Sequence, residues 1–63
     1  MDGMELKLLR ISKRVLQWDL AKKVGISPAK LSLIENGRRR VTPELAKLLV
    51  EGIEELARNE AKQ

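Results

Sequence analysis

The sequence contains no cysteine, no histidine, no tyrosine and no phenylalanine, and its only aromatic residue is Trp18. Without cysteine, the chain can form neither a disulfide framework nor a thiolate metal site. Without histidine, it lacks the most frequent general base and the most frequent metal ligand. These absences disfavour an enzyme, and we expect no catalytic residue, no metal and no cofactor.

Long hydrophobic runs are absent as well. The longest uninterrupted apolar run is residues 48–50, which is far too short for a signal-peptide core or a membrane span. We therefore expect a cytoplasmic protein without membrane association. A chain this short has room for one domain and no attached sensor, so we also expect no small-molecule ligand. With 63 residues, of which 43% are hydrophobic and 35% are charged, the composition predicts one small globular domain over residues 1–63.

Charge is plentiful but unevenly distributed. The net charge is +4, to which residues 1–40 contribute +6 and residues 41–63 contribute −2. A basic front part with an acidic tail indicates one surface that faces a polyanion and another that faces solvent or a partner. The charge counts alone fit an ordinary solvated surface equally well.

Apolar residues recur at helical spacing through most of the chain, and no segment alternates like a strand. Met4, Leu8 and Ile11 predict a helix over residues 4–14 that packs with these three side chains inward. Thr42-Pro43 predicts the start of a last helix over residues 43–58, or of a helix pair broken at Gly52. The fold class expected is all-α, a compact bundle of four to five helices.

Between these helices, residues 17–36 have the pattern of a helix-turn-helix. A short helix over residues 17–24 ends at Gly25, and a second over residues 28–35 begins after the capping residue Ser27. Small and apolar residues occupy the positions where two helices would cross around a tight turn. These positions are Leu20, Ala21, Val24, Gly25, Ile26, Leu31 and Ile34.

The segments Gln17-Trp18-Asp19-Leu20-Ala21 and Ile34-Glu35-Asn36-Gly37, in this relative spacing, resemble the phage repressor/Cro-type helix-turn-helix family. This family includes small transcriptional regulators of the xenobiotic-response-element type. The resemblance covers residues 4–56. It implies a lambda-repressor-like domain that binds double-stranded DNA, inserts a recognition helix (residues 28–35) into the major groove and acts as a homodimer on a near-palindromic operator.

The resemblance also assigns individual roles. It pairs Arg10 with Glu35 in a structural salt bridge and directs Gln17 and Asn36 to the DNA backbone, although Asn36-Gly37 can equally serve only as a helix stop. Charge chemistry favours DNA contacts for the three consecutive arginines that follow, although a solubilising loop is the alternative. The residues expected to contact DNA are Gln17, Ser27, Pro28, Ala29, Lys30, Ser32, Leu33, Asn36, Arg38, Arg39 and Arg40.

The expected recognition face is unusual because it is mostly apolar, with neither an arginine for guanine nor a glutamine for adenine. Ala29 and Leu33 can touch a thymine methyl group, and Ser32 can bond several base edges. An exposed apolar face can also bind a protein. The alternative function is thus a protein-interaction module of the same fold, antitoxin-like or a modulator of another regulator.

Three further positions carry expectations. Leu16 precedes the second helix where a serine or threonine cap is usual, so we expect that helix to lack a side-chain cap. Trp18 is expected to pack across the end of a neighbouring helix, with stacking on a DNA sugar as the alternative. The apolar stripe of the last helix predicts a dimer contact, although it can equally cover the first helix. The dimer residues expected are Leu49, Ile53 and Leu56.

Overall fold

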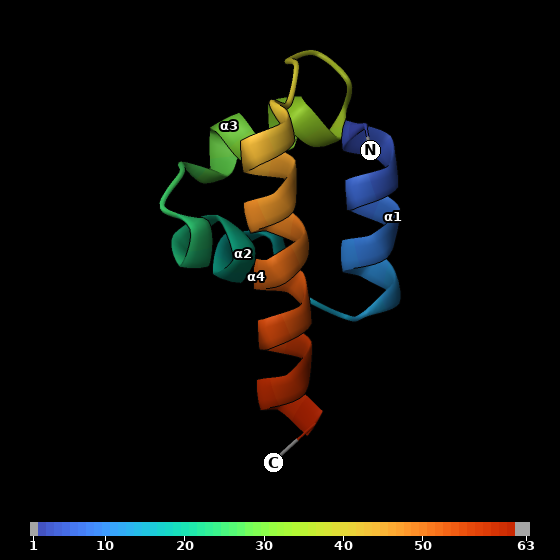
Figure 1. Ribbon diagram of the computed structural model, residues 1–63, viewed down its shortest axis with the longest axis vertical. Helices are drawn as coiled ribbons and strands as arrows, with labels where there is room; N and C mark the ends of the chain where they lie inside the picture. The colour runs from blue at the N-terminus through green and yellow to red at the C-terminus, as the bar shows by residue number, and fades with distance from the viewer. Residues whose placement is uncertain (1, 62–63) are drawn as a thin grey trace.

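The computed structural model describes residues 2–61, which form four helices. They are α1 (Gly3–Ser12), α2 (Gln17–Val24), α3 (Pro28–Glu35) and α4 (Pro43–Ala61). The bundle is all-α over this part of the chain, as expected. In Figure 1, α4 follows the long axis of the molecule, and its C-terminal end extends beyond the other helices. Helix α4 packs on α1 and α2, and α3 packs on the same two helices.

The boundaries of α2 and α3 are those predicted. Helix α1 begins one residue earlier than predicted because Asp2 and Glu5 form a capping box there. The Asp2 carboxylate accepts from the Glu5 backbone N–H at 2.8 Å, and the Glu5 carboxylate accepts from the Asp2 N–H at 3.0 Å. The spacing Asp-x-x-Glu is the sequence signal for this start.

Helix α1 also ends earlier than predicted, at Ser12. Arg14 has a left-handed backbone with φ +58°, and the Val15 N–H donates to the Arg10 carbonyl at 3.1 Å. This bond across five residues closes the helix and satisfies a terminal carbonyl. It also turns Val15, which is only 5% exposed, into the core.

Helix α4 is continuous, so the helix pair considered from the sequence does not form. The helix begins at Pro43, and the Thr42 hydroxyl accepts from the Leu45 N–H at 3.1 Å as its cap. Gly52 is buried against α2, where an added Cβ would lie 3.0 Å from Leu20 Cδ1. This glycine therefore allows α2 and α4 to approach closely.

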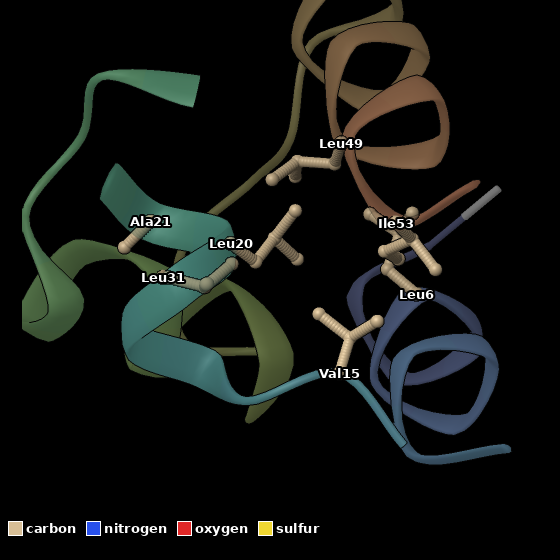
Figure 2. Packing of buried hydrophobic residues seen from close by; sticks show 7 residues of the cluster. All are labelled: Leu6, Val15, Leu20, Ala21, Leu31, Leu49 and Ile53. Carbon is tan, nitrogen blue, oxygen red and sulfur yellow. The ribbon is translucent and has the colours of Figure 1, made fainter. Parts of the chain in front are cut away.

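The core lies where all four helices meet (Figure 2). The predicted inward residues of α2 and α3 are confirmed, because Leu20, Ala21, Leu31 and Ile34 are at most 1% exposed. The buried hydrophobic cluster consists of Leu6, Val15, Leu20, Ala21, Leu31, Leu49 and Ile53. Between Asp2 and Ala61, none of the helices has the length and apolarity that crossing a membrane requires.

Helix α1 faces the core with a different side from the one predicted. Met4, Leu8 and Ile11 were expected inside but are 51%, 61% and 51% exposed. Leu6 is buried instead, at 1% exposure. The prediction followed one apolar stripe in a helix that carries leucines on two sides.

Two contacts explain this rotation of α1. A Cβ added at Gly3 would overlap the carbonyl oxygen of Ile34, so the start of α1 lies directly against the α3 backbone. Arg10 must also point inward to reach its partner on α3. Residues that are three and seven positions apart share one helix face, so burying Gly3 and Arg10 turns the opposite face outward.

The packing of α4 corrects the expected dimer contact. Leu49 and Ile53 are both 0% exposed within the single chain, because they fill the space between α1 and α2. Neither side chain reaches the surface that such a contact requires. Leu56 is half-buried and retains some surface, and Leu48 on the same helix is 52% exposed.

Candidate nucleic-acid interface

The turn between α2 and α3 holds the two helices of the motif together. Gly25 has φ +85°, a left-handed conformation that costs glycine little. The N–H groups of Gly25 and Ile26 both donate to the Ala21 carbonyl, at 2.9 and 3.0 Å. Ala21 is completely buried, as the close crossing of α2 and α3 requires.

The start of α3 is capped as the sequence predicts. The Ser27 hydroxyl accepts from the Lys30 backbone N–H at 3.1 Å, and Pro28 occupies the first helical position. The Ser27 hydroxyl oxygen is therefore already an acceptor within the helix cap. The Lys30 side chain lies in the first turn, where a cation opposes the helix dipole.

Helix α3 has one buried and one exposed face. Leu31, Ile34 and Glu35 point into the protein and are at most 1% exposed. On the opposite side, Ala29 and Leu33 are exposed, and Leu33 retains 41% of its surface. The outward face consists of the exposed residues Ala29, Leu33 and Asn36 and the half-buried Ser32, with Pro28 and Lys30, also half-buried, at its margins.

Two polar side chains on this outward face are bonded to each other. The Asn36 amide Nδ2 donates to the Ser32 hydroxyl oxygen at 3.4 Å, a long hydrogen bond. Ser32 and Asn36 are one helical turn apart, which brings their side chains together. Both side chains are uncharged.

Behind α3, a buried polar cluster joins α1 and α3 through the expected ion pair. Arg10 Nε and Nη2 donate to the two carboxylate oxygens of Glu35 at 2.7 and 3.1 Å. Arg10 Nη1 also donates to the Val15 carbonyl at 2.8 Å. The Glu35 side chain is 2% exposed, so these hydrogen bonds offset the cost of burying its carboxylate.

Gln17, expected at the DNA backbone, belongs to the same cluster. Its amide Nε2 donates to Glu35 Oε1 at 3.1 Å, and the residue is half-buried. The cluster therefore links the first residue of α2 to the last residue of α3. The sequence did not predict this bond. Gln17 and Glu35 are a donor and an acceptor that can pair, but they are 18 residues apart and meet only when α2 and α3 pack together.

The basic loop leaves the end of α3 directly. Gly37 has φ +75°, and the Arg38 N–H donates back to the Leu33 carbonyl at 2.9 Å. An open cavity of about 540 Å³ lies between this loop and the start of α1. The loop exposes three consecutive basic side chains, Arg38, Arg39 and Arg40.

Two apolar residues near the start of α2 are strongly exposed. Trp18 is 73% exposed, so the expected packing against a neighbouring helix is wrong. Leu16 is 65% exposed and provides no side-chain hydrogen bond at the N-cap of α2, which confirms the missing cap. Both lie next to Gln17 in the sequence.

The chain belongs to the helix-turn-helix domain family, whose model matches residues 3–58. This range includes all of α1, α2 and α3 and most of α4. No curated protein and no solved structure gave a match. Family membership associates this domain with DNA binding and the regulation of transcription. It does not specify the phage repressor/Cro type, which is a resemblance carried by residues 17–21 and 34–37.

Proposed function

We propose that this protein is a sequence-specific regulator of transcription, repressor-like in action, that inserts α3 into the major groove of double-stranded DNA. The observation that carries the proposal is the arrangement at the end of α3. An uncharged exposed helix face is followed, after one turn, by three exposed arginines. The helix face fits the floor of a groove, and the arginines fit the phosphates at its edge.

The polar residues around α3 have supporting roles in this proposal. The side-chain amide of Gln17 has two N–H bonds, and Glu35 accepts one of them, which leaves the second for a phosphate. The Asn36 amide offers a second N–H in the same way. The basic side chain of Lys30 and the hydroxyl of Ser27 stand at the start of α3, where a DNA strand would pass.

Dimerisation is part of the proposal. Two copies on a near-palindromic operator would place their α3 helices about 34 Å apart, one turn of DNA. Since Leu49 and Ile53 are buried in the single chain, the contact uses surface around Leu56 and the protruding end of α4 (Figure 1).

Fluorescence anisotropy of a labelled duplex, titrated with the protein over a salt series, tests the proposal. Replacing Arg38, Arg39 and Arg40 together with alanine is expected to weaken binding to all duplexes alike. The slope of log affinity against log salt should become shallower by about 0.9 for each phosphate that the variant no longer neutralises.

Lys47→Ala is the matched control for this experiment. Lys47 is an exposed basic residue within α4, outside both α3 and the loop of three arginines. Its replacement should leave both the affinity and the salt slope close to those of the unchanged protein. An arginine variant with the original salt slope would contradict the role of the loop.

A protein-interaction module, antitoxin-like or a modulator of another regulator, is the second candidate. The observation that favours it is the outward face of α1, where Met4, Leu8 and Ile11 are all at least 51% exposed. Aligned exposed apolar residues of this kind mark protein-binding surfaces. Co-purification of a partner that survives nuclease treatment and is absent with Leu8→Lys would favour this candidate over DNA binding.

A further inference from the structure

The outward face of α3 offers an unusual set of groups to a DNA groove. Ala29 and Leu33 are four residues apart, so their side chains lie one above the other on the helix surface. Leu33 keeps 41% of its surface exposed, although Leu31 and Ile34 beside it are fully buried. The face therefore presents a short apolar strip.

The major groove contains one kind of apolar group. Thymine carries a C5-methyl group there, whereas the other edges of the four base pairs are hydrogen-bond donors and acceptors. A leucine side chain gains nothing from those polar edges and strips water from them, which costs free energy. Methyl groups are thus the base feature that complements Ala29 and Leu33.

The polar pair beside the strip does not change this chemistry. Asn36 donates to the Ser32 oxygen, which leaves the Ser32 O–H to donate outward to an acceptor in the groove. Thymine places its O4 acceptor next to its C5-methyl group. Ser32 and Leu33 both belong to the outward face of α3, so a groove that receives this face can meet both side chains.

We infer that the outward face of α3 recognises pyrimidine 5-methyl groups in the major groove, with Leu33 as the main specificity-determining residue. This inference rests on the proposed DNA-binding function. The occupant is duplex DNA because the strip is bordered by Lys30 and followed by three exposed arginines, which complement the charge of a phosphate backbone.

Base analogues that differ only in the methyl group test this inference. The probe is a duplex selected from a randomised pool for binding to the full chain. Each thymine is then replaced singly by deoxyuridine. At one or two positions the affinity should fall about fourfold, the ratio that corresponds to about 0.8 kcal/mol for one buried methyl-sized group.

The second arm moves the methyl group to another base pair. At the same positions, a 5-methylcytosine·guanine pair should bind about fourfold more tightly than an unmodified cytosine·guanine pair. The two duplexes differ in no donor or acceptor. A change in affinity between them therefore reports on the methyl group alone.

Leu33→Ala connects the effect to the residue. This variant should bind thymine and deoxyuridine duplexes with a ratio near one, while its circular dichroism shows an intact helical fold. Leu48→Ala, an equally conservative change at a leucine 52% exposed on α4, should keep the fourfold ratio. Arg39→Ala should weaken both duplexes equally, because a phosphate contact ignores the base.

The outcomes separate this inference from the proposed function. Tight, salt-dependent binding that ignores every deoxyuridine substitution overturns methyl recognition and leaves DNA binding in place. Sensitivity to deoxyuridine that persists in Leu33→Ala overturns the assignment to this face. Absence of binding to every duplex in the pool overturns the proposed function, and methyl recognition with it.

Discussion

Leu16 occupies the N-cap of α2 with a side chain that cannot form a hydrogen bond. Its backbone, at φ −74° and ψ 142°, is nevertheless the extended conformation that a capping residue needs. Because the side chain is 65% exposed, removing its apolar atoms costs little. The position is ready for a cap that the sequence does not supply.

Leu16→Ser is therefore expected to raise the free energy of unfolding by about 0.5–2 kcal/mol, because the new hydroxyl can accept from a free N–H of α2. Urea denaturation followed by circular dichroism measures the change. Leu8→Ser is the control, since Leu8 is equally exposed but lies within α1, where serine is a poorer helix former than leucine. Equal effects of the two substitutions would contradict a capping gain.

Gly3 is required by a contact with another helix, not by the structure of its own helix. Its lack of a side chain has no local explanation, because it follows a cap and sits inside the first turn of α1. The reason lies on another helix, where the Ile34 carbonyl occupies the place of a Cβ. Contacts between residues 31 positions apart are not visible in local spacing, so this glycine could not be predicted.

At the scale of the elements, the sequence predicts α2, α3 and their turn closely, and the orientation of α1 poorly. The motif residues from Gln17 to Gly37 have one consistent periodicity and strong stop signals. Helix α1 has two apolar stripes, and periodicity alone does not choose between them. The expected pairing of Arg10 with Glu35 already favoured the other stripe, because Arg10 cannot face inward together with Met4, Leu8 and Ile11.

The Arg10–Glu35 ion pair links α1 to α3. Arg10→Met is expected to lower the free energy of unfolding by about 3–5 kcal/mol, because it leaves the Glu35 carboxylate buried without its partner. The double variant Arg10→Met/Glu35→Leu should recover a large part of that loss, since no unpaired charge remains.

Urea denaturation of both single variants and the double variant forms a complete cycle for this pair. The double variant should be more stable than Arg10→Met alone. If the losses from the two single substitutions simply add, the pair is not coupled and the electrostatic explanation is wrong. DNA binding by the double variant would show whether the pair also positions α3, since Glu35 is the last residue of that helix.

At the scale of the whole molecule, charge is divided between the motif and the outer face of α4. The Lys23–Glu55 ion pair, with a distance of 2.9 Å, joins the two regions across α2 and α4. The hydrogen bond and charge of Lys23, with a smaller effect of Arg58, lower the pKa of Glu55 below its usual value of 4.5. This carboxylate is more acidic in the folded chain than in the unfolded one.

The sign of the pH effect follows from that direction. A lowered pKa for Glu55 adds stability that is present above pH 4.5 and is lost as the pH falls through the folded-state value. The difference in unfolding free energy between the unchanged protein and Glu55→Gln should thus be small and positive at neutral pH and vanish in acid. Raising the salt concentration should also reduce it.

A difference between the two proteins that grows on acidification would contradict this account. Lys22→Ala is a useful comparison, because Lys22 is an exposed lysine on α2 with the same charge as Lys23. Its replacement should leave the pH dependence unchanged, whereas Lys23→Ala should abolish the contribution of Glu55.

The composition of the molecular surface was the feature that the sequence predicted least well. Length and composition predicted one small domain, and the spacing of apolar residues predicted that it is all-α, but which side of α1 and α4 faces solvent depends on how the helices pack. Leu49 and Ile53 illustrate this, because one apolar stripe serves equally well for a core and for a dimer contact. Only the packed structure shows that α1 and α2 already bury these two side chains.

Trp18 has a spectroscopic consequence. It is the only aromatic residue of the chain, and its indole is 73% exposed in the folded state. Its emission should resemble that of an indole in water and change little on unfolding, which makes it a poor reporter of folding. Trp18 stands beside Gln17 at the start of α2. A ligand that covers this end of the helix should therefore change the Trp18 emission, so its binding can be followed without an added label.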